Sequence, residues 1–273
     1  MQSFSNIHAL IIDMDGVLWE GNQALPGLLD FFSLLRQKEL RFILATNNAS
    51  LTQEQYIVKL RSLGVRVSAN EVLTSSMATA HYLSNLVDAK KSTALVIGEE
   101  GLRQPLIKVG FTLIDTPYSK QHKAADFVIC GLDRKLTWDK LAEASLHINA
   151  GAQFIASNAD TTLPTERGPV LGNGAILASL EAATQISATV IGKPEAIMYQ
   201  QAISILGIPA EHTVAIGDRL NTDILGAVNT GIRSIMVLTG ISSKDDLDSI
   251  DYQPTWILPD LPAITHALRT HNG

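Results

Sequence analysis

Short apolar runs alternate with longer amphipathic stretches along most of this chain. This alternation predicts repeated β-α units, which form a parallel sheet covered by helices. Strands are predicted at residues 9–12, 42–45, 94–97, 127–130, 154–156, 189–191, 213–216, 234–238 and 256–258. Helices are predicted at residues 26–37, 52–64, 100–109, 137–151, 174–183, 194–206 and 222–229, with a last helix after Pro259. The pattern therefore indicates an α/β fold.

Four polar clusters stand directly after predicted strands. They are Asp13-Met14-Asp15-Gly16, Thr46-Asn47-Asn48, Gly192-Lys193-Pro194 and the run from Gly217 to Asp223. In a parallel α/β sheet, ligands bind outside the carboxyl ends of the strands. Clusters that are far apart in sequence are therefore expected to meet at one edge of the sheet.

Asp13 and Asp15 are two residues apart, so their side chains lie on the same side while the chain stays extended. Two carboxylates held together repel each other unless a cation or a proton lies between them. A hard cation such as Mg²⁺ takes oxygen ligands, and Asp218 and Asp223 can supply the remaining negative charge. A strand end followed by a turn would also explain the two aspartates alone, but the other three clusters favour a metal site.

Thr46, Asn47 and Lys193 are candidates for binding a phosphate. The Thr46 hydroxyl both donates and accepts hydrogen bonds, and backbone N–H groups near a helix start hold phosphate oxygens. Lys193 can neutralise a phosphate or an acyl-phosphate. Taken singly, Thr46 and Asn47 also fit helix caps, and Lys193 also fits a solvated surface lysine.

Composition limits the classes of function. The 273 residues are 46% hydrophobic and 18% charged, with a formal net charge of -6, which is typical of a globular protein without a basic face for a nucleic acid polymer. The single cysteine, Cys130, lies in an apolar run and permits no internal disulfide, which suits a reducing cytoplasm. The first residues lack the features of a signal peptide, and no apolar run reaches the ~20 residues of a membrane span. We therefore expect a soluble, cytoplasmic protein that does not bind membranes.

The four clusters, in this order, resemble the signature motifs of the haloacid dehalogenase-like (HAD) hydrolase superfamily. The resemblance is closest to subfamily IIA, which contains the NagD-like and p-nitrophenyl phosphatase-like enzymes. It covers nearly the whole chain and extends to the run from Gly131 to Arg134, to Ser157-Asn158-Ala159-Asp160 and to Gly172-Asn173-Gly174. It implies a Rossmann-like, doubly wound parallel-sheet core and a Mg²⁺-dependent phosphatase that hydrolyses small phosphomonoesters through an aspartyl-phosphate.

The resemblance also implies roles for single residues. Asp13 would be the nucleophile, and Asp15 would be the general acid for the leaving alcohol and then the base for water. Thr46 and Asn47 would bind the phosphoryl oxygens, and Lys193 would balance their charge. The family motif often has Thr where this chain has Val17, but valine is also common in subfamily IIA.

The same resemblance implies the metal ligands. Asp13, the backbone carbonyl of Asp15, and Asp218 would hold Mg²⁺, with Asp223 supporting the metal shell from outside. Metal coordination and a lysine lower the repulsion between a carboxylate nucleophile and a phosphate dianion. The seven histidines show no metal-ligand spacing.

Residues 80–186 contain too many predicted strands and helices for a loop. They are predicted to form an inserted α/β cap domain, of C2 type by the family resemblance, while residues 1–79 and 187–273 form the catalytic core. A closed cap would exclude water and select the leaving group. Candidates for specificity in the cap are Asp133, Asn158, Asp160 and Arg167, although each is also a common turn former or surface residue.

Other functions remain open on the same fold. A phosphotransferase or phosphomutase is one alternative, and a non-catalytic protein that binds a phosphate ligand is another. A dehalogenase needs neither a metal nor a second aspartate, so Asp15, Asp218 and Asp223 argue against it. The absence of membrane spans excludes a P-type pump. The expected partner is a small phosphorylated metabolite that the sequence does not name, and the resemblance is compatible with a homodimer.

Overall fold

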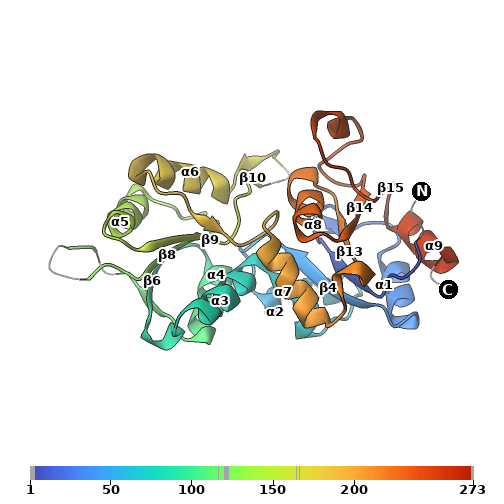
Figure 1. Ribbon diagram of the computed structural model, residues 1–273, viewed down its shortest axis with the longest axis horizontal. Coiled ribbons are helices and arrows are strands. Elements are labelled where there is room, and N and C mark those ends of the chain that lie inside the picture. Colours follow the sequence, from blue (N-terminus) through green and yellow to red (C-terminus); the bar gives the residue numbers. More distant parts are fainter. Residues whose placement is uncertain (1–3, 116, 120–122, 164, 166, 272–273) are drawn as a thin grey trace. The chain divides into compact units, whose positions relative to one another are not determined.

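The computed structural model describes residues 4–115, 117–119, 123–163, 165 and 167–271. The chain divides into two compact units (Figure 1). The first unit consists of Met1–Thr46, Glu54–Leu73 and Lys193–Gly273, and the second consists of Asn47–Gln53 and Thr74–Gly192. The first unit therefore combines the two ends of the chain, whereas the second is built mainly from its middle.

A six-stranded sheet forms the centre of the first unit, with the order β15-β14-β13-β1-β4-β5. Its strands are β1 (Ala9–Ile12), β4 (Arg41–Thr46), β5 (Val72–Thr74), β13 (Thr213–Gly217), β14 (Arg233–Val237) and β15 (Trp256–Leu258). Ile12 pairs in parallel with Ile216 of β13 and with Leu44 of β4. All four residues of β1 are buried, as expected for a parallel strand that is covered on both faces.

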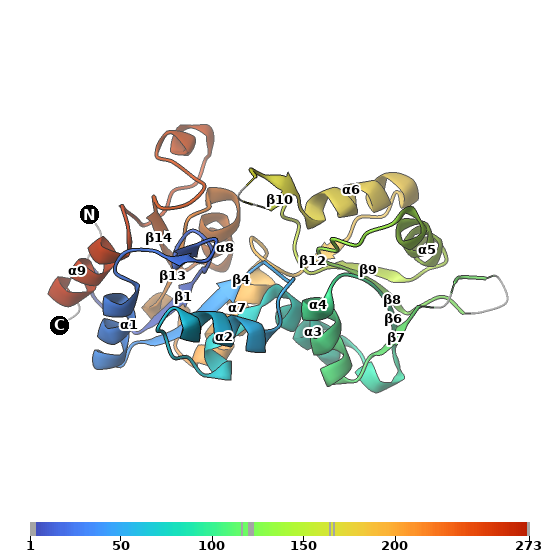
Figure 2. The ribbon, with the colours of Figure 1, turned by 180° about the vertical axis from the view of Figure 1, so that it is seen from behind.

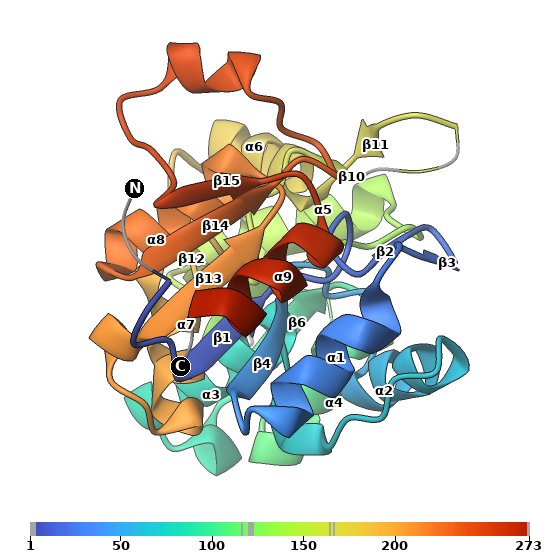
Figure 3. The ribbon, with the colours of Figure 1, turned by 90° about the vertical axis from the view of Figure 1, so that its right-hand side faces the viewer.

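Helices cover both faces of this sheet. The helices α1 (Leu28–Gln37) and α9 (Leu261–His271) pack against each other on the face that Figure 3 turns to the viewer. The helices α7 (Ala196–Leu206) and α8 (Leu225–Thr230) pack together against strands of the sheet, and α2 (Gln53–Ser62) follows β4. A short hairpin of β2 (Trp19–Glu20) and β3 (Gln23–Ala24) leaves the end of β1.

The second unit has its own parallel sheet of five strands, in the order β12-β9-β8-β6-β7. Its strands are β6 (Thr93–Ile97), β7 (Thr112–Ile114), β8 (Phe127–Cys130), β9 (Gln153–Ala156) and β12 (Thr189–Val190). Figures 1 and 2 show α5 (Trp138–Asn149) and α6 (Asn173–Thr184) on one side of this sheet, with α3 (Ser75–Leu86) and α4 (Glu100–Val109) on the other. Alternate strand residues such as Val128 and Cys130 pack beneath α5 and α6.

The predicted α/β fold with a Rossmann-like core is confirmed, and most predicted elements are present. The pattern missed β5 and α3, two hairpins and β7. The sequence of α3 is rich in serine, alanine and threonine and lacks a clear apolar stripe, and its start is marked by Thr74, whose hydroxyl accepts from the Met77 N–H at 3.2 Å. The second missed hairpin joins β10 (Thr162–Leu163) and β11 (Val170–Leu171), which are too short to show alternation.

The boundaries between the units differ from the predicted domain limits. The second unit runs from Thr74 to Gly192 and includes Asn47–Gln53, whereas the predicted insertion was 80–186. The missed helix α3 explains the difference at the first boundary. Among the described residues, no helix is both long and apolar enough to cross a membrane.

Candidate active site

Three neighbouring strands of the first unit end at the same edge of the sheet. Asp13 follows β1, Thr46 is the last residue of β4, and Asp218 follows β13. Because β1 lies between the other two strands, their side chains are brought together. The Asp13 N–H donates to the Ile216 carbonyl at 2.8 Å, which continues the parallel pairing to the site itself.

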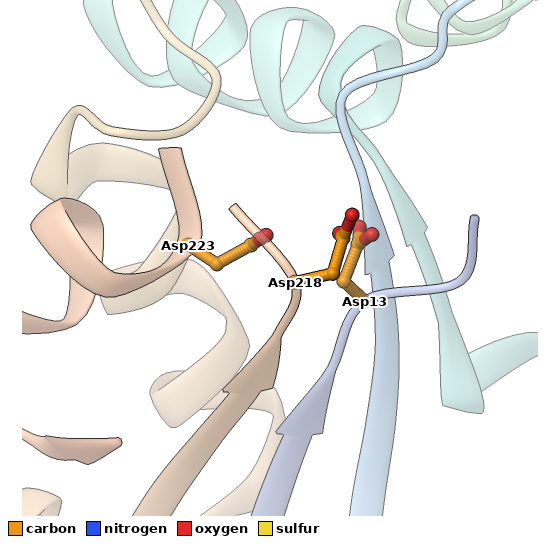
Figure 4. A group of neighbouring side chains, drawn as sticks. All are labelled: Asp13, Asp218 and Asp223. Atoms are coloured by element: carbon orange, nitrogen blue, oxygen red, sulfur yellow. The ribbon is translucent and has the colours of Figure 1, made fainter. Parts of the chain in front are cut away.

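Asp13, Asp218 and Asp223 form a compact group of carboxylates (Figure 4). One carboxylate oxygen of each lies within 4.8 Å of the others. Burial, helped by the charge of Asp223, raises the pKa of Asp218 to about 6. Burial also raises the pKa of Asp13 well above its usual value, although Lys193 opposes this effect. The group therefore carries more negative charge than its buried surroundings favour.

The hydrogen bonding of the Asp218 carboxylate indicates whether this group of residues fits a metal ion. Its Oδ1 is buried and has no hydrogen-bond partner among the described residues, while its Oδ2 accepts from the Ile241 N–H at 2.7 Å. A buried carboxylate oxygen without a donor is unfavourable, and a cation would satisfy it. Three oxygen donors from carboxylates suit a hard divalent ion. These residues therefore fit Mg²⁺.

Lys193 is buried at the start of the last part of the first unit. Its Nζ donates to Asp13 Oδ1 at 2.5 Å, to Asp223 Oδ1 at 2.7 Å and to the Ala45 carbonyl at 3.0 Å. Burial by itself lowers the pKa of Lys193, but Asp13 and Asp223 outweigh it and hold the pKa well above its usual value. The lysine is therefore a fixed positive charge beside Asp13 and not a solvated side chain.

The Asp223 carboxylate forms hydrogen bonds with Lys193 and with the turn that contains Asp223. Its Oδ1 accepts from Lys193, and its Oδ2 accepts from the Arg219 N–H at 3.1 Å. The turn Leu220–Ile224 is a short π-helix, and a Cβ at Gly217 would lie only 2.1 Å from the Cβ of Asp223. Glycine is thus required at 217 for this close approach. Both carboxylate oxygens of Asp223 therefore have a hydrogen-bond donor within the first unit.

Asp15 and Thr46 also lie at this edge of the sheet, Asp15 just after β1 and Thr46 at the end of β4. The Asp15 carboxylate accepts from the Trp19 indole N–H at 2.7 Å and is partly exposed. Thr46 is buried and its side chain shares a hydrogen bond with the hydroxyl of buried Tyr56. Both predicted residues therefore belong to the same unit as Asp13, Lys193, Asp218 and Asp223.

Asn47 begins the first segment of the second unit, where it joins two of the residues predicted for specificity. Its side-chain amide donates to Asp160 Oδ1 at 3.0 Å, and its carbonyl accepts from Asn158 Nδ2 at 2.8 Å. The Ser75 hydroxyl donates to the same carbonyl at 2.8 Å. Asn173 in turn donates to the Asn158 carbonyl at 2.6 Å. This network fixes the backbone immediately after Thr46.

The two other predicted specificity residues have different surroundings. Asp133 is buried, pairs with Lys140 at 2.6 Å and accepts from the Lys135 N–H at 2.8 Å. Those contacts stabilise its own loop. Arg167 is exposed, and its backbone N–H donates to the Thr165 hydroxyl at 3.3 Å.

The sequence interpretation missed the loop after β14. The Thr239 hydroxyl of this loop donates to the Gly16 carbonyl at 2.6 Å, and the Ile241 N–H donates to Asp218 Oδ2. A Cβ at Gly240 would lie 1.9 Å from Asp218 Oδ2, so this loop packs directly on the carboxylate. The signal was present, because Thr239-Gly240 follows a strand just as the four recognised clusters do.

The sequence matches two family models. One, described as haloacid dehalogenase-like hydrolase, covers residues 10–112, and the other, described as HAD-hydrolase-like, covers residues 190–264. An acid sugar phosphatase from Staphylococcus epidermidis is 36% identical over 253 residues, which are 93% of this chain and 95% of that protein. This chain belongs to the haloacid dehalogenase-like hydrolases.

Solved structures of similar proteins have the same fold as this chain. NagD from Escherichia coli K-12 has a TM-score of 0.84 at 36% identity, over 93% of this chain and 97% of that one. A glycerol phosphate phosphatase from Mycobacterium tuberculosis, in complex with magnesium, has a TM-score of 0.86 at 35% identity, over 95% of this chain and 76% of that one. The predicted membership of the NagD-like subfamily IIA is confirmed, and so is the prediction of a phosphatase that hydrolyses phosphoesters.

Proposed function

We propose that this HAD phosphatase hydrolyses small phosphomonoesters through an aspartyl-phosphate on Asp13, with Mg²⁺ as cofactor. One observation carries the proposal. Asp13 stands at the end of the central strand β1, bonded to the buried ammonium of Lys193 and next to the carboxylates of Asp218 and Asp223. A carboxylate approaches a phosphate dianion only where positive charge is already fixed in place.

In the first step, an oxygen of Asp13 attacks phosphorus and the bond to the ester oxygen breaks. Asp15 donates a proton to the departing oxygen, which leaves as an alcohol. Lys193 and the hydroxyl of Thr46 bind the phosphoryl oxygens, and the backbone after Thr46 is fixed by the network around Asn47. Covalent catalysis divides one difficult displacement into two easier ones.

In the second step, Asp15 is a carboxylate and takes a proton from water. The oxygen of this water attacks phosphorus, and the bond from phosphorus to Asp13 breaks. Inorganic phosphate leaves, and Asp13 is regenerated. Bound Mg²⁺ would be held by Asp13, Asp218 and, from the family resemblance, the Asp15 carbonyl, and it would neutralise charge on the phosphoryl oxygens.

The class of substrate is proposed from the relatives. One is named an acid sugar phosphatase and another a glycerol phosphate phosphatase, so small polyol or sugar phosphates are the substrates that we propose here. We propose that Asp133, Asn158, Asp160 and Arg167 of the second unit contribute to the choice among them. Transfer to an acceptor other than water, and phosphate binding without catalysis, are the alternatives that experiment must separate.

The test compares Asp13→Asn with Asp139→Asn, an exposed aspartate at the start of α5. The wild type and Asp139→Asn should release phosphate from glycerol phosphate and p-nitrophenyl phosphate, and Asp13→Asn should release it from neither. Excess chelator should abolish the activity, Mg²⁺ should restore it, and Ca²⁺ should substitute poorly. Acid quench followed by mass spectrometry should find one phosphoryl group on the peptide that contains Asp13. Full activity in excess chelator, or a phosphoryl group elsewhere, would contradict the proposal.

A further inference from the structure

A tight turn after β1 brings Trp19 back to Asp15. The Leu18 N–H donates to the Met14 carbonyl at 2.8 Å, and the Gly16 N–H donates to the Trp19 carbonyl at 2.8 Å. Gly16 has a φ of 80°, in the left-handed region that favours glycine. Asp15 and Trp19 consequently form an isolated bridge, four residues apart in sequence.

The indole of Trp19 donates to the carboxylate through this turn. The distance from Nε1 to Asp15 Oδ1 is 2.7 Å, and Trp19 is 0% exposed. An indole N–H is a donor only, and a bond to an ionised carboxylate is among the stronger hydrogen bonds in proteins. The bond restricts rotation of the Asp15 carboxyl group and occupies one of its two oxygens.

Lys59 holds the indole from its ring face. The Nζ of Lys59 lies 4.2 Å from the centroid of the Trp19 ring and donates to the Gly21 carbonyl at 2.9 Å. A cation over the face of tryptophan is attracted to the ring. Lys59 belongs to α2, so it ties the β2–β3 hairpin to a helix and keeps Trp19 in place.

We infer that Trp19, supported by Lys59, is a positioning residue for the proton transfer by Asp15. The inference rests on the proposed function. The Trp19 N–H fixes Oδ1 of Asp15, so Oδ2 is the oxygen that carries the proton. In the first step Oδ2–H gives its proton to the ester oxygen as the bond to phosphorus breaks. In the second step the same oxygen takes a proton from the attacking water.

The variant Trp19→Phe keeps an aromatic ring but loses the N–H. A leaving group that is a basic alkoxide needs its proton, whereas nitrophenolate leaves readily without one. For Trp19→Phe, kcat/KM on glycerol phosphate should therefore fall about tenfold to hundredfold. On p-nitrophenyl phosphate it should change by less than about threefold. Trp138→Phe is the matched control, because Trp138 is 78% exposed, and it should change neither value.

Lys59→Met supplies a second variant that leaves Trp19 intact. It removes the charge above the ring, and it should show the same selective loss on glycerol phosphate with a smaller amplitude. Lys244→Met, at an exposed lysine of the same unit, is its control. Thermal melts of each variant with Mg²⁺ establish that the fold is retained before rates are compared.

Measurements on the Asp15→Asn variant distinguish the positioning role of Trp19 from the proposed role of Asp15 itself. If Trp19 acts through Asp15, adding Trp19→Phe to Asp15→Asn should leave kcat/KM on glycerol phosphate within about twofold. An equal loss on both esters for Trp19→Phe, or a full further loss in the Asp15→Asn background, would overturn the positioning role. An Asp15→Asn protein that treats both esters alike would instead contradict the proposed role of Asp15 itself.

Discussion

Asp223 and Lys193 form an ion pair in which both side chains are buried, with exposed fractions of 2% and 3% and a distance of 2.7 Å between Oδ1 and Nζ. Removing two charges from water is unfavourable unless further hydrogen bonds satisfy both groups. Here Lys193 also donates to Asp13 and the Ala45 carbonyl, and Asp223 also accepts from the Arg219 N–H. The pair and its partners therefore join four separate parts of the chain at the end of β1.

Replacing Lys193 by methionine should destabilise the protein as well as inactivate it. The change leaves Asp13, Asp218 and Asp223 buried together without their cation. Breaking a buried pair in this way costs about 3 to 5 kcal/mol. Urea unfolding in metal-free buffer measures the loss, and added Mg²⁺ should recover part of it. Lys244→Met is the control, and a loss below about 1 kcal/mol would show that Lys193 does not stabilise the site.

Gly240→Ala should weaken magnesium binding. Its new Cβ would lie 1.9 Å from Asp218 Oδ2, so the carboxylate or the loop must move. Displacement of a metal ligand or of its supporting group typically lowers affinity about 10- to 100-fold. Titration of Mg²⁺ against stability or activity measures this. Ile241→Ala is the control, because it keeps the backbone N–H that donates to Asp218 while changing a side chain that is 60% exposed. Equal Mg²⁺ affinity in the two variants would contradict this prediction.

The stabilising effect of Mg²⁺ should depend on pH through Asp218. Its pKa is raised from 3.8 to about 6, so without metal its contribution to stability is present below pH 3.8 and is lost as the pH rises through about 6. Mg²⁺ binds the deprotonated carboxylate, and its binding releases protons. The rise in melting temperature caused by Mg²⁺ should therefore be small near pH 4.5 and grow up to about pH 7. Asp218→Asn should flatten this dependence, and an equal rise at both pH values in the wild type would contradict it.

Much of the fold is visible in the sequence because its strands are buried on both faces. The runs Ala9–Ile12 and Phe127–Cys130 are continuous and apolar, and helix α4 is bounded by an acidic start and by Gly110. The missed elements lack these signals. Strand β5 has three residues, and the helix after it is stabilised by its cap and its packing on α4 more than by an apolar stripe.

The strand ends that form the site can also be predicted from the sequence, but the side-chain contacts within the site cannot. The clusters of Asp13, Thr46 and Asp218 meet because parallel strands end together. The bond from Trp19 to Asp15 depends on a turn whose geometry the sequence does not specify. The pairing of Asp133 with Lys140 depends on how its loop meets the first turn of α5. Such side-chain pairings depend on the tertiary structure, so the pattern and spacing of residues in the sequence do not predict them.

Changes at Asp160 and Arg167 should alter the preference among esters. Asp160 is part of the network around Asn47 and Asn158, and Arg167 is exposed on the same unit. The ratio of kcat/KM between sugar phosphates and glycerol phosphate should shift by about 10-fold for Asp160→Ala or Arg167→Ala, while activity on p-nitrophenyl phosphate persists. Arg103→Ala, in α4 of the same unit, is the control. Unchanged ratios would exclude these two residues from substrate selection.

Substitution of Asp13 and substitution of Asp15 should impair catalysis in different ways. Asp13→Asn removes the nucleophile, so no aspartyl-phosphate forms and all esters should fail together. Asp15→Asn removes only the proton carrier, and general acid catalysis typically contributes about 10²- to 10⁴-fold. Its first step should therefore lose far more on glycerol phosphate than on p-nitrophenyl phosphate.

The second step gives the sharper measurement. Asp15→Asn has no base to activate water, so the phospho-enzyme should accumulate once it has formed. Rapid mixing of this variant with p-nitrophenyl phosphate and Mg²⁺ should release nitrophenolate in a burst close to one equivalent of enzyme, followed by a stall. Wild-type protein is the control and should show no stall of this kind, because its Asp15 completes hydrolysis. An equal loss on both esters without a burst would mean that Asp15 only supports the turn or the metal site, since a lost proton carrier cannot slow a leaving group that needs no proton.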